Sequence, residues 1–388
     1  MNNIQILNKI SPIGLEQFDR TKYAYAEEIE NPDGLLLRSA KIHDMEFGES
    51  VKAIARAGAG VNNIPIDRCS KEGIVVFNTP GANANAVKEM VFAGLLMSAR
   101  KVAPSLDWVQ TLKGEGENVP ALIEKGKSKF AGPELKGKTL GVIGLGAIGI
   151  QVANLAIAFG MDVYGYDPYI SVDSAWELSR SVNHAKTLEE IYAKSDYVTI
   201  HVPLNPETKS LINAETIKRM KHGVRIVNFA RGELVETADI IEALNEGLVS
   251  CYLTDFGNDE LLGQKGVVVF PHLGASTPES EDNCAKMAVM ELSNFLENGN
   301  IVNSVNMPNV VMERSGDVRL TVIHENKPNM LSQILAVLSE KGLNVENLTN
   351  KSKKEYAYTM VDVLGNVDAD IENAVSAIDG VIKVRIIK

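Results

Sequence analysis

The chain has 388 residues, of which 45% are apolar and 23% are charged, so its composition is that of a globular protein rather than a disordered one. Its length predicts two or three domains. The 39 basic and 50 acidic side chains give a net charge of −11, which opposes binding to nucleic acid or to an anionic membrane. Three cysteines lie far apart without a Cys-x-x-Cys pair. We therefore expect no disulfide framework, no metal site and a reducing, cytoplasmic environment.

Two segments bear on targeting and membranes. Residues 1–18 contain no basic stretch leading into an apolar core, so the sequence predicts no secretory signal. Residues 139–161 lack charge over a length that could span a membrane, but they contain five glycines together with Gln151 and Asn154. A buried strand, a tight turn and a helix explain this segment better than a membrane span.

The first third of the chain alternates short apolar runs with helical patterns. Residues 34–38, 53–57 and 74–78 are strand-like and are bounded by Gly, Asn or Pro, which is typical of an open α/β domain. Residues 86–101 repeat apolar side chains at helical spacing and predict a long buried helix. Residues 113–138 are rich in Gly, Glu and Lys and predict a loop or arm between two units.

Six further strand candidates follow in series, and helical segments separate several of them. They are nearly continuous apolar runs, as a parallel sheet covered on both faces requires. This pattern predicts a second, doubly wound α/β domain. The six candidates are residues 139–143, 162–166, 197–202, 224–229, 251–255 and 267–270.

A long helix and a compact module complete the chain. Thr277 fits a helix N-cap with Pro278 at the first helical position, so a helix is expected to run to about Asn298 and to return the chain to the first domain. Residues 303–317 mix Asn, Pro, Ser and Gly as a linker. Residues 318–387 then read strand, helix, strand, strand, helix, strand, which predicts a βαββαβ module.

A glycine-rich turn carries the first functional signal. The string G-x-G-x-x-G at residues 144–149 follows a predicted strand and opens a predicted helix, the context that a dinucleotide-binding turn needs. Asp167 ends the next strand, where a carboxylate can accept the adenosine ribose hydroxyls and repel a 2′-phosphate. The sequence therefore predicts NAD rather than NADP, although an Asp before Pro168 could also simply form a turn.

Candidate catalytic side chains follow the later strands of the second domain, where doubly wound sheets place their ligands. Removing hydride from a hydroxy acid requires a base, a carboxylate that orients the base and a cation that holds the substrate carboxylate. His272, Glu260 and Arg231 supply these roles. Each has a structural alternative: a capping or core histidine, a solvated loop acid beside Asp259, and a surface ion-pair partner.

With these motifs the sequence resembles the D-2-hydroxyacid dehydrogenase family over essentially the whole chain, and most closely its members with a C-terminal ACT domain. The resemblance implies two Rossmann-like domains plus the βαββαβ ACT module. It divides the chain into a discontinuous substrate-binding domain (1–82 and 275–309), an NAD-binding domain (83–274) and an ACT domain (310–388). The matching strings are residues 78–83, 141–149, 166–169, 201–204, 230–235 and 271–277.

The resemblance also implies the roles of individual residues. Arg231, Glu260 and His272 match the catalytic triad, and Asp255 matches the acid that holds the nicotinamide amide. The implied cofactor-binding residues are Gly144, Gly146, Ala147, Ile148, Gly149, Asp167, His201, Val202, Pro203, Ala230, Asp255, His272 and Gly274. The implied substrate-binding residues are Arg38, Ser39, Lys41, Arg56, Gly58, Ala59, Gly60, Asn83 and Arg231.

Two departures from the family pattern stand out. Many relatives carry Glu-Pro at the position of the candidate acid, whereas here Glu260 is followed by Leu261, and only 11 residues separate Glu260 from His272. In the tail, His324, Asn326 and Asn344 match positions where serine-sensitive relatives hold L-serine, but Asn329 replaces the glycine usual at the helix entry. A purely structural dimerisation module is the alternative to an effector site.

The resemblance implies NAD-dependent oxidation of 3-phospho-D-glycerate to 3-phosphooxypyruvate, the first step of L-serine biosynthesis, by a homodimer or homotetramer. One alternative is another 2-hydroxyacid activity, such as reduction of glyoxylate or 2-oxoglutarate. Another is a dinucleotide-sensing regulator of the same fold, although the corepressors of that class lack an ACT tail.

Overall fold

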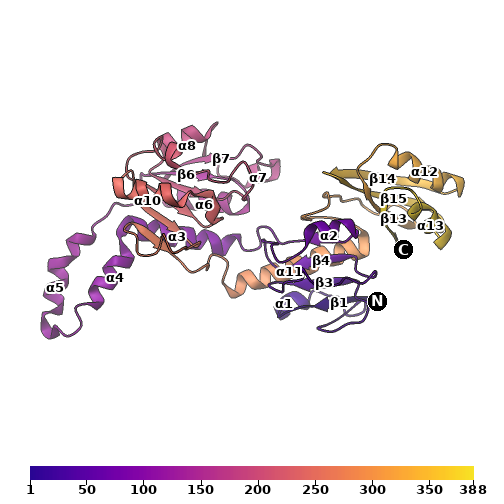
Figure 1. Ribbon diagram of the computed structural model, residues 1–388, viewed down its shortest axis with the longest axis horizontal. Coiled ribbons are helices and arrows are strands. Elements are labelled where there is room, and N and C mark those ends of the chain that lie inside the picture. Colours follow the sequence, from indigo (N-terminus) through magenta and orange to yellow (C-terminus); the bar gives the residue numbers. More distant parts are fainter. The chain divides into compact units, whose positions relative to one another are not determined.

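The computed structural model describes residues 1–388, and the chain divides into two compact units (Figure 1). One unit contains residues 1–83 and 278–388, and the other contains residues 84–277. The chain thus leaves the first unit once and returns to it at Pro278. No helix combines the length and the apolar character that crossing a membrane demands.

The first unit is built on a five-stranded parallel sheet in the order β2-β1-β3-β4-β5. The three strands that the sequence predicts, at residues 34–37, 53–56 and 75–77, are short apolar runs that are almost entirely buried. The two strands at one edge are additions to the predicted set. The strands are β1 (Asn2–Ile6), β2 (Tyr23–Ala26), β3 (Gly34–Leu37), β4 (Ala53–Arg56) and β5 (Val75–Phe77), and the short helices are α1 (Pro12–Leu15) and α2 (Ile66–Lys71).

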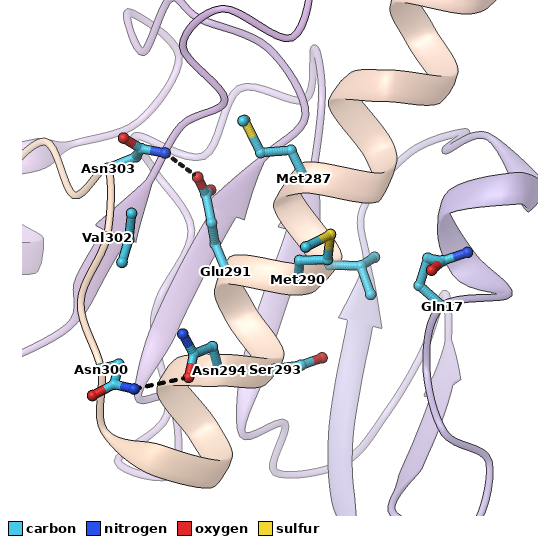
Figure 2. Close-up of a pocket in the computed structure, with 10 residues that line it drawn as sticks. Gln17, Met287, Met290, Glu291, Ser293, Asn294, Asn300, Val302 and Asn303 are labelled. Carbon is cyan, nitrogen blue, oxygen red and sulfur yellow. Dashed lines mark hydrogen bonds between the residues drawn. The ribbon is translucent and has the colours of Figure 1, made fainter. Parts of the chain in front are cut away.

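Helix α11 (Pro278–Asn298) packs against this sheet, with the bounds that its capping signals predict. Its buried face joins the core of the first unit through Ala288, Leu292 and Phe295. The same helix also buries a carboxyl group. Glu291 is 8% exposed, and its Oε1 accepts a hydrogen bond of 2.7 Å from Asn303 Nδ2 beside a surface cavity (Figure 2). Burial raises the pKa of Glu291 to about 8.

The second unit contains a seven-stranded parallel sheet in the order β12-β11-β10-β9-β6-β7-β8. The direction of winding reverses between β6 and β9, which is the doubly wound arrangement that the apolar runs predict. The strands are β6 (Thr139–Ile143), β7 (Asp162–Tyr166), β8 (Asn183–His184), β9 (Tyr197–Ile200), β10 (Val224–Asn228), β11 (Val249–Thr254) and β12 (Val267–Val269). The covering helices are α6 (Ala147–Ala158), α7 (Val172–Glu177), α8 (Leu188–Lys194), α9 (Ala214–Ile217) and α10 (Thr237–Glu246).

Helix α3 (Ala84–Arg100) opens the second unit and packs on α6, in agreement with the long buried helix expected at residues 86–101. An arm of short helices follows it (Figure 1). The arm contains α4 (Val102–Gln110), η1 (Gly116–Asn118), α5 (Val119–Gly126) and η2 (Lys127–Phe130). The segment expected to be a loop or arm is thus largely helical.

The C-terminal segment has the predicted element order βαββαβ and forms a four-stranded antiparallel sheet in the order β14-β15-β13-β16. Its elements are β13 (Val318–Glu325), α12 (Met330–Glu340), β14 (Asn344–Lys353), β15 (Tyr356–Leu364), α13 (Ala369–Ser376) and β16 (Val381–Ile387).

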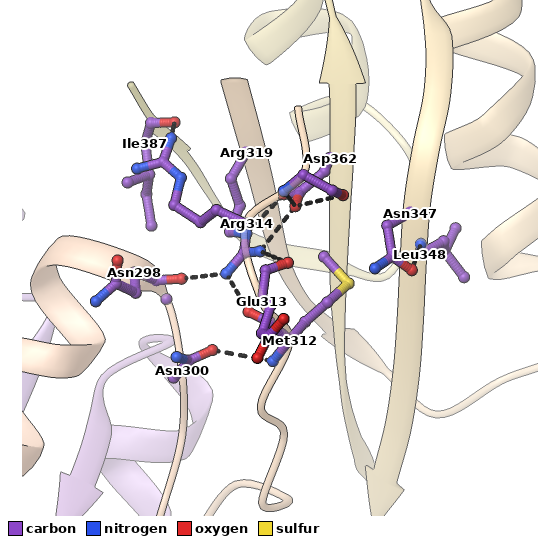
Figure 3. Close-up of polar contacts among 12 residues, drawn as sticks. Asn298, Asn300, Met312, Glu313, Arg314, Arg319, Asn347, Leu348, Asp362 and Ile387 are labelled. Carbon is purple, nitrogen blue, oxygen red and sulfur yellow. Dashed lines mark hydrogen bonds and ion pairs between the residues drawn. The ribbon is translucent and has the colours of Figure 1, made fainter. Parts of the chain in front are cut away.

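A buried ion pair joins this segment to the rest of the first unit (Figure 3). The Arg319 guanidinium, which is fully buried, donates to both carboxylate oxygens of Asp362 at 2.6 and 2.8 Å. Its other N–H groups donate to the backbone oxygens of Asn298, Met312 and Glu313 at 2.8 to 3.0 Å. Arg319 therefore ties β13 to the end of α11 and to the linker.

Candidate active site

The glycine-rich turn has the geometry that a dinucleotide requires. Gly144 lies at φ +93°, and a Cβ there would approach the His201 backbone oxygen to 2.6 Å. A Cβ on Gly149 would come within 1.9 Å of the Gly144 oxygen, so only glycine allows α6 to start this close to β6. Gly146, the N-cap of α6, has open space where its Cβ would point. The exposed first turn of α6 can therefore receive a pyrophosphate on its free N–H groups.

Asp167 lies beside this turn and fixes it. Its Oδ2 accepts a hydrogen bond of 2.9 Å from the Leu145 N–H, and its Oδ1 accepts one of 2.8 Å from the Tyr169 N–H. Each carboxylate oxygen can accept a second hydrogen bond. The turn-forming role and the predicted ribose contact are thus compatible at one side chain.

His201 follows β9, at the same edge of the sheet, with Val202 and Pro203 next in the chain. Burial lowers the pKa of His201 to about 4, so the ring is neutral at physiological pH. Its Nε2 forms a hydrogen bond of 2.9 Å with Thr199 Oγ1. A neutral ring beside the glycine turn adds no charge to a cofactor pocket.

Asp255 is the centre of the charged part of the site. The residue is 6% exposed, and its Oδ1 has no hydrogen-bond partner within the protein. Burial raises the pKa of the Asp255 carboxyl, whereas the nearby charge of His272 and the Gly274 N–H oppose the rise. Arg231 acts in the same direction. The structure thus brings together four of the residues that the sequence selects, around one carboxylate.

His272 and Arg231 are both exposed at the carboxyl ends of the strands. The His272 ring lies edge-on to Phe256, with ring centroids 4.9 Å apart at an interplanar angle of 88°. An exposed imidazole that is held in place by an aromatic neighbour can exchange a proton with a bound hydroxyl. The geometry therefore fits a base and a cation that meet a substrate at this edge.

Asn228, which no sequence motif identifies, organises the backbone of the loop at Ala230 and Arg231. This buried side chain ends β10, where its Nδ2 donates to the Arg231 backbone oxygen at 2.8 Å and its Oδ1 accepts from the Ala230 N–H at 3.2 Å. An Asn that ends a strand whose other residues are apolar except for Arg225 is the signal that would have identified it. Asn228 therefore holds the backbone of the candidate substrate clamp.

Glu260 does not join the cluster around Asp255. It is exposed, and it lines a cavity with residues of α10, including Ile241 and Asn245. The next residue, Leu261, is buried against the core under β11, and Asn258 Oδ1 accepts a hydrogen bond of 3.0 Å from its N–H. Asp255 is thus the carboxylate whose electrostatic partners include His272.

The candidate substrate loops belong to the first unit. Arg38 Nη1 pairs with Glu281 Oε1 of α11 at 2.6 Å, while Ser39 and Lys41 are exposed. The backbone of residues 58–60 is held by hydrogen bonds from the Thr79 N–H to the Gly58 oxygen at 3.2 Å and from Asn78 Nδ2 to the Ala59 oxygen at 2.6 Å. Arg56 ends β4 beside this loop, and Asn83 ends the first segment of the unit.

The three candidate effector residues do not meet within one chain. Both ring nitrogens of His324 are engaged, Nδ1 with the Glu325 oxygen at 2.7 Å and Nε2 with Thr359 Oγ1 at 2.9 Å. The strand register aligns residues 344 and 345 with the beginning of β13, whereas His324 lies near the end of β13. Six residues along β13 separate the position opposite Val345 from His324, which corresponds to a distance of about 20 Å. Within one chain, His324 and Asn344 are therefore too far apart to contact the same small ligand.

At the entry to α12, Asn329 adopts the left-handed conformation at φ +70°. Asparagine is among the residues that tolerate this conformation best after glycine. The substitution therefore keeps the backbone turn.

Comparison with known proteins identifies the second unit. A family model described as "D-isomer specific 2-hydroxyacid dehydrogenase, NAD binding domain" matches residues 92–274. A D-3-phosphoglycerate dehydrogenase of Methanocaldococcus jannaschii is 35% identical over 342 residues, covering 86% of this chain and 63% of the relative. One of Haemophilus influenzae is 30% identical over 379 residues, covering 93% and 88%. The chain spans less than two thirds of the length of several curated relatives, including 55% of the Bacillus subtilis enzyme.

Solved structures agree with this assignment. The NAD+-bound 3-phosphoglycerate dehydrogenase of Entamoeba histolytica matches with a TM-score of 0.61 and 28% identity, covering 79% of this chain and 98% of that one. A glyoxylate reductase structure with a TM-score of 0.64 but 23% identity shares the fold. The glycine turn and the unpartnered Asp255 oxygen both suit a bound dinucleotide, in agreement with these structural similarities. The chain belongs to the D-isomer-specific 2-hydroxyacid dehydrogenase family and carries its NAD-binding domain.

Proposed function

We propose that this protein catalyses the NAD-dependent oxidation of 3-phospho-D-glycerate to 3-phosphooxypyruvate, the first step of L-serine biosynthesis. The observation that carries the proposal is the cluster of Arg231, Asp255 and His272 at the strand edge that also holds the glycine turn. The similarity to several D-3-phosphoglycerate dehydrogenases supports the choice of substrate within the family.

The residues of the cluster have distinct roles in the proposed reaction. Arg231 binds the substrate carboxylate through its planar guanidinium. His272 accepts the proton of the 2-hydroxyl as the C2–H bond breaks. Bound NAD supplies the acceptor for the hydride that leaves C2. Asp255 stabilises the imidazolium that forms and accepts a hydrogen bond from a cofactor amide at its free Oδ1. Glu260 is proposed as the third member of the catalytic triad because its position matches the family motif.

The loops of the first unit supply the remaining contacts to the substrate. Arg38, Lys41 and Arg56 carry positive charge, and the neighbouring turn at residues 58–60 leaves little room for a side chain at Gly58. A Cβ on Gly58 would come within 2.3 Å of the Arg56 guanidinium. This set suits a substrate with both a phosphate and a carboxylate. Residues 1–82 and 275–309 are proposed as the substrate-binding domain, and residues 83–274 as the NAD-binding domain.

The C-terminal segment, residues 310–388, is proposed to be an ACT domain that pairs with a second copy. Because His324 and Asn344 lie at opposite ends of β13, isologous pairing would place His324 and Asn326 of one copy opposite Asn344 of the other. L-serine bound there would inhibit the enzyme only if it binds one conformational state more tightly. The protein is accordingly proposed to be a homodimer or homotetramer.

A direct assay tests the proposed reaction. The purified chain with NAD and 3-phosphoglycerate at alkaline pH should produce NADH absorbance, with NADP a poorer acceptor because Asp167 repels the 2′-phosphate. D-Glycerate, glyoxylate and 2-oxoglutarate serve as comparison substrates. Faster turnover of any of these than of 3-phosphoglycerate would reassign the substrate, and equal use of NADP would refute the role of Asp167.

A further inference from the structure

A cavity of about 700 Å³ in the first unit is unusually basic for this acidic protein. Six basic and three acidic side chains line it, although the whole chain carries a net charge of −11. Its walls come from β16, from the C-terminal end of α11 and from residues near β4. The proposed dehydrogenase reaction uses none of these residues.

Two basic side chains at the centre of the wall have no acidic partner. Lys383 and Arg385 are two positions apart on β16, so their side chains leave the same face of the strand. Lys383 Nζ donates to the backbone oxygens of Val51 at 2.6 Å and Glu49 at 3.4 Å. Neither residue forms an ion pair. Both charges are therefore held by backbone oxygens alone.

Arg385 is anchored at the end of α11. Its Nη1 and Nη2 donate to the Phe295 and Leu296 oxygens at 3.4 and 3.0 Å, and its guanidinium lies 4.4 Å from the centre of the Phe295 ring. A helix C-terminus and an aromatic face both favour a cation. They orient the guanidinium at the cavity wall without neutralising its charge.

The other basic side chains of the wall are engaged in other ways. Lys22 pairs with Glu297 at 2.6 Å, and Lys52 pairs with Asp33. Arg314 donates to the backbone oxygens at the end of β16 (Figure 3). The uncompensated charge is thus concentrated at Lys383 and Arg385.

The charges around Lys383 favour the binding of an anion. The pKa of Lys383 is lowered to about 8, mainly by burial and in addition by the charges of Arg385 and Lys52, while Glu72 and Glu49 oppose the shift. Two half-buried like charges side by side are unfavourable unless an anion offsets them. A tetrahedral dianion would accept hydrogen bonds from both side chains and cancel their repulsion.

We propose that this cavity binds a small tetrahedral dianion, inorganic phosphate or a phosphate monoester, between Lys383 and Arg385. The bound anion links β16 to the end of α11 and to the segment before β4. It thereby strengthens the attachment of the C-terminal module to the sheet of the first unit. The site is separate from the loops proposed to bind the substrate.

Calorimetry with sulfate tests the proposal, because the charge of sulfate is constant between pH 7 and 9. Titration of the full chain at fixed ionic strength should show one sulfate site. Lys383→Met should lower the affinity of this site for sulfate by at least about tenfold, whereas Lys383→Arg should keep the affinity within about threefold. Lys341→Met, at an exposed lysine after α12, is the matched control and should leave binding unchanged. Circular dichroism of each variant verifies that it is folded.

Two further measurements separate this site from the candidate substrate loops. Arg56→Met should leave the sulfate site intact, and the affinity should fall about tenfold from pH 7 to pH 9 as Lys383 loses its proton. Glycerol 3-phosphate should compete with sulfate, and tighter binding than inorganic phosphate would assign a monoester. Absence of binding, or binding lost in Arg56→Met but kept in Lys383→Met, would overturn the proposal whether or not the protein oxidises 3-phosphoglycerate.

Discussion

At the scale of single residues, the site depends on charges placed at the ends of strands. The electrostatic partner of His272 is Asp255, which is buried and follows β11, and not the exposed Glu260. Asn228 adds a contribution of a different kind, because its side chain hydrogen-bonds to the backbone of Ala230 and Arg231 and fixes it. Both effects depend on three-dimensional neighbours.

The first prediction concerns the base. His272→Ala should lower kcat by at least about 10², because a positioned base contributes about 10²–10⁴ in rate. NADH binding, followed by fluorescence, should persist in this variant. His184→Ala, at an exposed histidine of β8, is the control and should keep full activity. Turnover of His272→Ala within a few-fold of the unchanged protein would refute the assignment.

The second prediction concerns the buried carboxyl of Glu291, whose pKa is raised from 4.5 to about 8. The folded protein binds this proton more tightly than the unfolded chain, so its contribution to stability is present below pH 4.5 and is lost as the pH rises to about 8. Glu291→Gln should remove this dependence and raise the free energy of unfolding at pH 8.5 by about 2–4 kcal/mol.

Denaturant unfolding at pH 5 and pH 8.5 measures this difference. Glu297→Gln, on the same helix but with its carboxylate more exposed, is the comparison variant. An unchanged pH dependence in Glu291→Gln would show that Glu291 is ionised in the folded protein.

At the scale of elements, two glycines in the turn between β6 and α6 are needed for different reasons. Gly149 is required for packing, since a Cβ would come within 1.9 Å of the Gly144 oxygen, whereas Gly146 faces open space. The sequence motif identifies both positions but not this difference.

The third prediction follows from that contrast. Gly146→Ala should fold with an unchanged Tm but bind NADH at least about tenfold more weakly, because its methyl group occupies the approach of the pyrophosphate. Gly149→Ala should lower the Tm as well, because α6 must move away from β6. Thermal unfolding with and without NADH distinguishes the two. Equal affinity of Gly146→Ala and the unchanged chain would place the cofactor elsewhere.

The fourth prediction concerns the buried Arg319–Asp362 pair. Arg319→Met leaves an unpaired buried carboxylate and should destabilise the C-terminal module by about 3–5 kcal/mol. Adding Asp362→Leu should restore much of this loss, because the uncompensated charge is then removed. Hydrogen exchange of β13 and β15 in the full chain measures both effects. Lys194→Met, which breaks an exposed pair with Glu190, should change stability by less than about 1 kcal/mol.

At the scale of the whole molecule, the sequence predicts elements well where burial and capping act together. Helix α11 begins at Pro278, as its N-cap signals predict, and ends at the expected Asn298, and six of the seven strands of the larger sheet follow apolar runs. The predictions were incomplete where the side chains are not buried. Strand β8 has two exposed residues, and α4 has no buried residue, so neither carries a periodic apolar signal.

For the candidate site, the sequence predicts the residues that are close together along the chain better than those brought together by tertiary contacts. The glycine turn and Asp167 are local in sequence and were identified directly. The grouping of Asp255, His272 and Arg231 follows from strand order in a parallel sheet. The outward position of Glu260 and the engaged ring of His324 depend on contacts with α10 and with Thr359 of another strand, which spacing along the chain does not encode.

The most direct test of the account is the fate of the hydrogen on C2 of the substrate. We expect 3-phospho-D-glycerate deuterated at C2 to yield deuterated NADH in a single turnover, with no label lost to solvent, and His272→Ala to reduce the rate without changing where the label goes. Loss of the deuteron to solvent with no label in NADH, or no reaction of 3-phosphoglycerate at any alkaline pH, would contradict the proposed oxidation.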